Sequence, residues 1–190
     1  MKIRDVFEDI FIGYNLTNSA VDDKYAKYYK SLQKDSIQYT NVVPNKLIEK
    51  KYSSDIKKKY YLQDKDIIIF IKKPYRVGTY SEDDNEIIVP NNFVILRGID
   101  SDKYSYIFLA NYLERIGIKK YVEKNNKDGN LSIEDIKEID LPDIPKIDQV
   151  KITRLLKNIN RRSAIYSNIL DNDEKIIDYF LNMIVGDNNG

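Results

Sequence analysis

The sequence predicts an α+β domain over residues 1–145, followed by one long C-terminal α-helix over residues 146–186. Two observations predict this division. Short apolar runs rich in β-branched residues alternate with helix-like segments and turns as far as Pro145. From Ile147 to Ile184 the chain has neither proline nor glycine, and its apolar residues recur at helical spacing. The last four residues, 187–190, form a short tail.

Several apolar segments predict the strands of the first domain. Residues 67–71 form a continuous apolar run, which is typical of a buried strand. Residues 76–80 predict a second strand, in which Gly78 allows a bulge or a close approach of another chain segment. The remaining predicted strands cover residues 86–89, 93–96 and 139–142, and Pro142 ends the last of them.

Three segments of the first domain predict helices. Residues 20–33 have amphipathic spacing, with apolar positions at Val21, Tyr25, Tyr28, Tyr29 and Leu32. Residues 104–115 have a similar apolar face. Ser132 precedes Asp135 by three residues, which is the spacing of a capping box and predicts the start of a short helix.

The C-terminal helix carries an apolar stripe when position a of a heptad is placed at Ile152. A continuous helix would span about 55–60 Å, which is too long to pack only on one small domain. The alternatives are a break at residues 171–174, which could cap a second helix, and packing of the stripe on its own domain. We expect a continuous helix whose stripe contacts a partner through Ile152, Leu155, Leu156, Ile159, Tyr166, Ile169, Ile176 and Phe180.

The two halves of this helix carry opposite charge. Residues 146–162 contain six basic residues and one acidic residue, whereas residues 163–190 contain five acidic residues and one basic residue. An antiparallel partner of the same sequence would place the basic half against the acidic half. The pattern therefore predicts an antiparallel coiled coil between two copies of the chain.

Composition excludes several classes of function. The chain has 190 residues with no cysteine and no histidine, which removes disulfides, thiolate metal sites and Ser–His or Cys–His catalysis. We therefore predict no metal site and no cofactor. No segment approaches ~20 apolar residues, so we expect no membrane span. The N-terminus lacks the apolar run of a signal peptide, and we expect a cytoplasmic protein.

The net charge of +1 hides a strongly basic segment. Residues 46–76 contain ten basic and only four acidic residues. A basic face of this kind suits the neutralisation of phosphates, although a solvated lysine-rich surface explains the charge equally well. The 16 tyrosines also admit two explanations, which are base stacking and the codon bias of an A·T-rich genome.

Four stretches, in their order and spacing, resemble the DNA-specificity (S) subunits of type I restriction–modification systems. Residues 131–142 and 144–152 resemble a family motif in which a Glu-Gln pair follows two prolines, and Asp148 replaces the usual Glu before Gln149. Residues 62–69 are similar to a family strand, with Lys65 in place of the usual glycine. The other two stretches are residues 3–7, with Gly13 shortly after them, and residues 73–78.

This resemblance implies a half-length S subunit, with one target-recognition domain and one spacer helix. Two such chains would pair their helices antiparallel and rebuild a pseudo-complete subunit, which agrees with the charge pattern above. The implied partners are double-stranded DNA, methyltransferase subunits and, in some complexes, restriction subunits. The implied role is to direct that complex to a bipartite DNA site as a homodimer.

The family implies that loops of the recognition domain enter the major groove. Arg76 could contact guanine or hold a phosphate, and Tyr75 could stack on a base or belong to the core. The candidate phosphate and base contacts are Lys57, Lys58, Lys59, Lys72, Lys73, Lys127, Asn91, Asn92, Asn125 and Asn126. Asn91 and Asn92 are equally suited to a simple turn.

We expect no catalytic residue in this chain. Tripeptides at residues 135–137 and 173–175 match fragments of a nuclease motif, but such matches arise by chance in a chain rich in Lys and Asp. Any methylation or restriction would belong to partner subunits. The alternative to a DNA-reading subunit is a decoy or interaction protein, which docks a methyltransferase through its helix without reading DNA.

Overall fold

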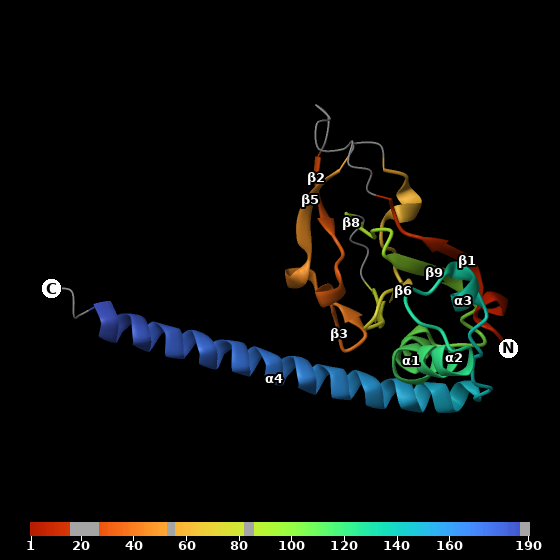
Figure 1. The fold of residues 1–190 in the computed structure, drawn as a ribbon. Coiled ribbons are helices and arrows are strands. Elements are labelled where there is room, and N and C mark those ends of the chain that lie inside the picture. The colour runs from red at the N-terminus through yellow and green to blue at the C-terminus, as the bar shows by residue number, and fades with distance from the viewer. Residues whose placement is uncertain (16–26, 53–55, 82–85, 187–190) are drawn as a thin grey trace. The chain divides into compact units, whose positions relative to one another are not determined.

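The computed structural model describes residues 1–15, 27–52, 56–81 and 86–186 (Figure 1). The predicted tail at residues 187–190 lies outside these ranges. The chain divides into two compact units, residues 1–151 and residues 152–190. The first unit is a mixed α+β domain with two sheets, and the second is the greater part of one long helix.

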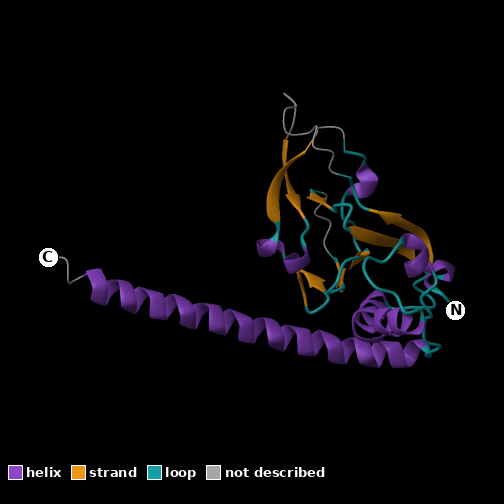
Figure 2. Ribbon diagram, viewed as in Figure 1, coloured by secondary structure: helices purple, strands orange, loops and turns teal. Residues whose placement is uncertain are grey.

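A six-stranded sheet forms the centre of the first unit (Figure 2). All its neighbouring strands are antiparallel, except that β4 pairs with β7 in parallel. The sheet confirms the strands predicted at residues 67–71, 76–80 and 93–96. In sheet order, the strands are β1 (Phe7–Ile12), β9 (Phe93–Ile99), β6 (Ile67–Phe70), β7 (Arg76–Thr79), β4 (Asn41–Val42) and β3 (Ile37–Gln38).

Strand β6 separates two hydrophobic clusters, because alternate side chains of a strand point to opposite faces. Ile67 and Ile69 pack in the cluster that includes the helices after β9. Ile68 and Phe70 pack in a second cluster on the other face. All four side chains are buried, which explains why this segment is a continuous apolar run and not an alternating one.

A smaller sheet corrects the helix predicted at residues 20–33. Its order is β5 (Ile48–Tyr52), β2 (Lys27–Ser31) and β8 (Ile87–Ile88), with β5 antiparallel and β8 parallel to β2. Residues 27–31 are therefore a strand, while residues 20–26 lie outside the described part of the chain. The tyrosines at 28 and 29 suit a pleated sheet as well as a helix, and pairing on both edges of β2 decides the outcome. Strand β8 confirms the short strand predicted at residues 86–89.

The helices after β9 cover one face of the large sheet. Ser105 caps α1, because its side chain accepts a hydrogen bond from the Phe108 N–H at 3.4 Å. The capping box of Ser132 and Asp135 is present as predicted and begins α3. The elements are α1 (Tyr106–Tyr112), the π-helix η6 (Leu113–Gly117), α2 (Ile118–Lys124) and α3 (Ile133–Lys137). Short 3-10 helices are η1 (Ile3–Asp5), η3 (Lys34–Ser36), η4 (Pro44–Lys46) and η5 (Lys58–Tyr60).

The strand predicted at residues 139–142 does not form. Asp140 makes one isolated bridge with Lys2, and the Leu141 N–H donates to the Met1 carbonyl at 2.9 Å. The apolar alternation instead places Ile139 and Leu141 in the main hydrophobic cluster beside the N-terminal segment. Alternate side chains of an extended segment can therefore be buried without strand pairing, and the sequence pattern is then the same as that of a strand.

Helix α4 (Lys146–Gly186) is continuous, so no break occurs at residues 171–174. Its first turn belongs to the first unit. Gln149 is buried, and its side-chain amide donates to the carbonyls of Lys103 and Ile144 at 2.9 Å each. The Gln149 Oε1 atom accepts from the Ser105 N–H at 2.9 Å. One side chain thus fixes the entry to α4.

None of the helices in the described ranges combines the length and apolar character that a membrane span requires.

Candidate nucleic-acid interface

One end of the large sheet collects most of the predicted site residues. Phe70, the last residue of β6, pairs with Arg76 on one side and with Phe93 on the other. The turn at residues 71–75 and the turn at residues 91–92 therefore lie at the same end. They contact each other directly, because the Ile71 N–H donates to the Asn92 carbonyl at 3.1 Å.

Residues 125–129 lie beside the turn at residues 71–75. Lys73 Nζ contacts Asp128 Oδ1 at 2.6 Å, and the Tyr75 hydroxyl donates to the Gly129 carbonyl at 2.7 Å. We call residues 13–15, 71–75, 90–92 and 125–129 the loop end. It brings together eight of the predicted contacts, namely Lys72, Lys73, Tyr75, Asn91, Asn92, Asn125, Asn126 and Lys127.

The last residues of β1 bring a further segment to the loop end. The Gly13 N–H donates to the Phe93 carbonyl at 2.9 Å. A Cβ atom on Gly13 would lie 2.2 Å from the Pro90 carbonyl oxygen, so only glycine permits this approach. Next to it, Asn15 Oδ1 accepts from Asn91 Nδ2 at 2.9 Å. The close approach at Gly13 therefore brings Asn15, which was not among the predicted contacts, against Asn91, which was.

The polar side chains of the loop end differ in their exposure and in their hydrogen bonds within the chain. Lys72 and Asn126 are exposed, and Asn126 has a left-handed backbone with φ of 48°. Asn125 is also exposed, but its amide donates to the Tyr121 carbonyl at 2.8 Å. Asn92 Oδ1 is buried with no hydrogen-bond partner among the described residues. The loop end thus presents amide groups and lysines that can contact base edges and phosphates.

Arg76 is held by the carboxylate of Glu114, which was not among the predicted site residues. Its Nη1 atom lies 2.9 Å from Glu114 Oε1, and Glu114 Oε2 accepts from the Val77 N–H at 2.5 Å. Burial raises the pKa of Glu114, while the Val77 N–H and Arg76 oppose that rise. The Arg76 side chain remains 43% exposed. Glu114 therefore orients a guanidinium that keeps further donors for a ligand.

Lys127 belongs to the capping network of α3. Its Nζ atom lies 2.9 Å from Asp135 Oδ1, which also accepts from the Tyr121 hydroxyl at 2.9 Å. Asp135 Oδ2 accepts from the N–H and the hydroxyl of Ser132, both at 2.9 Å. Burial raises the pKa of Asp135, but these donors together outweigh burial and lower the pKa to about 2. The network fixes the last residues of the loop end to α3.

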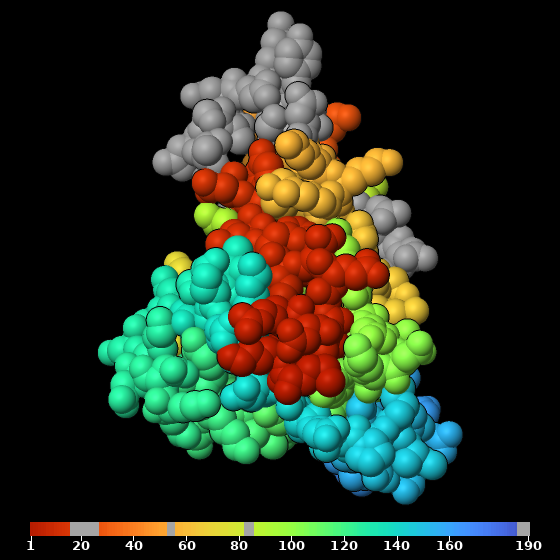
Figure 3. All heavy atoms as spheres, turned by 90° about the vertical axis from the view of Figure 1, so that its right-hand side faces the viewer, coloured from red at the N-terminus to blue at the C-terminus, as the bar shows by residue number. Residues whose placement is uncertain are grey.

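The predicted lysines at 57–59 form a second group on η5. Lys59 Nζ lies 5.0 Å from the ring centroid of Tyr60 and 5.6 Å from that of Phe11. Tyr14 connects this group to the loop end, because its ring lies 5.4 Å from that of Tyr60 and its chain neighbour Asn15 contacts Asn91. Figure 3 shows one face of the domain, with the N-terminal segment between the gold segment that carries η5 and the teal segment that carries α2 and α3.

Arg97 fixes the position of η5. Its Nε and Nη2 atoms contact Asp66 Oδ1 and Oδ2 at 2.9 and 2.7 Å, and the Asp66 side chain is completely buried. The same guanidinium donates to the carbonyls of Lys59 and Tyr61 at 3.1 and 2.8 Å. Asp66 was visible in the sequence only as part of a polar turn before a strand. Nothing in the sequence linked it to Arg97.

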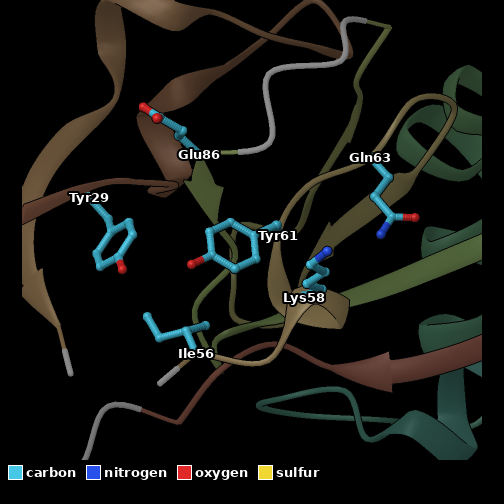
Figure 4. Close-up of a pocket in the computed structure, with 6 residues that line it drawn as sticks. All are labelled: Tyr29, Ile56, Lys58, Tyr61, Gln63 and Glu86. Atoms are coloured by element: carbon cyan, nitrogen blue, oxygen red, sulfur yellow. The ribbon is translucent and has the colours of Figure 1, made fainter. Parts of the chain in front are cut away.

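Five tyrosines pack against one another between η5 and the small sheet. Tyr14 and Tyr29 each contact Tyr52 edge to face, and Tyr29 contacts Tyr61 at a centroid distance of 6.2 Å. Burial, together with Tyr29, raises the pKa of Tyr61 to about 12. A pocket of about 540 Å³ opens here (Figure 4), lined by Tyr29, Ile56, Lys58, Tyr61, Gln63 and Glu86. These rings pack on one another, which accounts for part of the high tyrosine content without base stacking.

Lys65 stands where the family pattern has glycine, and the structure shows the backbone that glycine would favour there. Its backbone is left-handed, with φ of 63°, and its N–H donates to the Tyr80 carbonyl at 2.9 Å. The left-handed region favours glycine, which is the residue that the family has here. The turn before β6 is therefore kept despite the substitution.

The described part of the chain holds no group of three or more acidic side chains placed to bind a metal ion. The loop end, η5 and the adjacent Arg76 together offer lysines, one oriented arginine, amides and aromatic rings. Such groups bind anions and hydrogen-bond to polar edges.

No family model and no curated protein matches the chain. Solved structures do match it in fold. A chain from a structure of the complex assembly and conformational transition of the type I R-M system has a TM-score of 0.60 at 17% identity, covering 92% of this chain and 41% of that one. The HsdS subunit of Thermoanaerobacter tengcongensis has a TM-score of 0.58 at 17% identity, covering 89% of this chain and 39% of that one.

The S subunit of the type I restriction–modification system of M. genitalium has a TM-score of 0.55 at 16% identity, covering 92% of this chain and 42% of that one. This chain therefore spans about two fifths of the length of the chains that it matches. The resemblance seen in four sequence stretches is confirmed at the level of the fold, which is that of part of a type I specificity subunit.

Proposed function

We propose that this chain is a non-catalytic DNA-specificity module of a type I restriction–modification system. The observation that carries this proposal is the collection of eight separately predicted contacts at one end of one sheet, in a fold similar to S subunits. Those residues come from three stretches of the sequence, which the pairing of β6 with β7 and β9 and the contacts of Lys73 and Tyr75 bring together.

The lysines and the amides have different roles in this proposal. Lys72, Lys73 and the lysines of η5 contact phosphates and position the domain on the duplex. Asn91, Asn125 and Asn126 reach base edges in the major groove, where an amide can pair with adenine. Arg76, oriented by Glu114, contacts guanine or a phosphate from the edge of the loop end.

The partners follow from the same proposal. The chain acts in the cytoplasm as a homodimer through α4, whose exposed apolar side chains include Leu155 and Tyr166, at 59% and 66% exposure. Two domains related by a two-fold axis then read one bipartite DNA site. Methyltransferase subunits, and in a full complex restriction subunits, supply the chemistry.

One observation favours the second candidate, a decoy that docks a methyltransferase without reading DNA. Lys73, Arg76 and Lys127 each contact a carboxylate of the same chain, at 2.6–2.9 Å. Cations neutralised in this way contribute less to DNA binding. However, the Asp128 partner of Lys73 is 94% exposed, and such a surface pair exchanges readily for a phosphate.

Selection from a library of random DNA duplexes separates the two candidates. The purified chain is used alone and with a type I methyltransferase subunit from the same genome. Enrichment of a defined word, lost in N91A/N126A but kept in the helix variant K157A/R161A, is the expected result. Binding of the methyltransferase with no enriched word would contradict the proposal and support the decoy.

A further inference from the structure

The apolar stripe of α4 is interrupted by two residues of opposite charge. With position a at Ile152, every a and d position up to Met183 is apolar except Arg162 and Asp173. Both are exposed, and among the described residues neither has an oppositely charged side chain within ion-pair distance. Since α4 is continuous, both charges stay on the stripe and would be buried by any partner that covers it.

We propose that, in an antiparallel pair of two copies, Arg162 of each copy faces Asp173 of the other and so fixes the register of the pair. The proposal rests on the homodimer of the proposed function. In an antiparallel coiled coil an a residue faces a d residue, so one matched layer determines all others. The remaining layers then join Tyr166 to Ile169, Ile159 to Ile176, Leu155 to Phe180, and Ile152 to Met183.

Every apolar a or d residue in that span thus faces another apolar residue. The flanking e positions extend the contact, because Leu156 lies beside Ile177 of the second copy.

The neighbouring registers are worse for a specific reason. A shift of one heptad in one direction sets Arg162 against Tyr166 and Asp173 against Leu155. The opposite shift sets Arg162 against Phe180 and Asp173 against Ile169. Either shift buries four unpaired charges in the dimer, and an in-register parallel pair sets each charge against its own kind. Unpaired buried charges are strongly destabilising, so these arrangements are less stable than the proposed register.

Disulfide cross-linking tests the register directly, because the chain has no cysteine of its own. Among antiparallel registers, only the proposed one places the thiol introduced by I152C opposite the thiol introduced by M183C in the variant I152C/M183C. We expect it to form a covalent dimer on mild oxidation, while I152C by itself forms none. Cross-linking of I152C alone would show a parallel pair and overturn the proposal.

Charge reversal tests the two residues. R162D and D173R should each weaken dimerisation by roughly tenfold or more, measured by sedimentation equilibrium, because each places like charges in a buried layer. The double variant R162D/D173R should recover the wild-type dissociation constant to within about threefold. A double variant as weak as the single ones would overturn the proposal.

A matched apolar variant distinguishes the effect of the two charges on register from their effect on the strength of dimerisation. R162L/D173L should dimerise at least as tightly as the wild type, because apolar layers replace buried charges. In the I152C/M183C background it should nevertheless cross-link less completely, since shifted registers become accessible. Undiminished cross-linking would show that the two charges do not set the register.

These assays do not depend on DNA reading. A dimer with the expected register but no enriched DNA word would leave this inference standing and remove the DNA-reading part of the proposed function. A wild-type chain that stays monomeric at tens of micromolar would overturn both the register and the proposed homodimer.

Discussion

Arg97 and Asp66 form a two-pronged ion pair inside the domain, with Nε–Oδ1 and Nη2–Oδ2 distances of 2.9 and 2.7 Å. The pair joins the middle of β9 to the residue before β6. Through its remaining donors Arg97 also holds the carbonyls at both ends of the turn from Lys59 to Tyr61. A buried charge pair therefore positions the lysines of η5, which are candidate phosphate contacts.

Replacing Arg97 with leucine should destabilise the domain by about 3–5 kcal/mol at pH 7, because it leaves the Asp66 carboxylate buried without its partner. Urea unfolding measures this loss. Burial already raises the pKa of Asp66, and Arg97 opposes that rise. The pKa should rise further in R97L, so the destabilisation should shrink as the pH falls and Asp66 takes up a proton. A loss below ~1 kcal/mol at pH 7 would contradict this role.

Asp135→Asn should cost about 1 kcal/mol at pH 7, because it weakens the cap of α3 and its contact with Lys127. The pKa of Asp135 is about 2 in the folded chain, below its ordinary value of 3.8. Its stabilisation is therefore complete above pH ~4 and is lost as the pH falls towards 2. The difference between D135N and the wild type should vanish over that interval, and a constant difference would argue against the network.

Lys65→Gly should stabilise the domain by ~0.5–1 kcal/mol, because glycine adopts the left-handed backbone at this position without the steric cost. D64G is the matched control. It removes the same Lys65–Asp64 contact of 3.6 Å but places glycine where no left-handed backbone is present, so it should destabilise. Thermal unfolding of both variants distinguishes them. Destabilisation by K65G would show that the turn does not favour glycine.

Lys72→Ala combined with Lys73→Ala should weaken DNA binding and flatten its dependence on salt. Each lost phosphate contact lowers the slope of log K against log salt by roughly 0.9. Fluorescence anisotropy over a salt series measures the slope. The control K157A/R161A removes two positive charges from the outer face of α4 and should leave the slope near that of the wild type. Equal slopes in both variants would place the phosphates elsewhere.

Local features of the fold could be predicted from the sequence, because their causes lie within a few residues. The capping box of Ser132 and Asp135 and the continuity of α4 are of this kind. Strand β2 could not be, since tyrosine spacing fits a helix and a strand alike, and pairing with β5 and β8 decides between them.

The sequence predicted the residue types of the candidate site, but not the hydrogen-bond and ion-pair partners that hold those residues. Lysines and asparagines in polar turns stand out in the sequence, and the topology of β6, β7 and β9 brings them together. Their partners do not stand out, because Glu114 lies 38 residues from Arg76 and looks like an ordinary helix residue. Long-range pairs of this kind depend on the packed fold.

We propose that this chain reads DNA, and that two identical copies read one site. Methylome sequencing of a host that carries this gene with its methyltransferase is the decisive test. Because a two-fold axis relates the two domains, the methylated motif should be an interrupted palindrome, with two inverted copies of one short word about a helical turn apart. A continuous motif, or methylation that does not change when this gene is deleted, would contradict the claim.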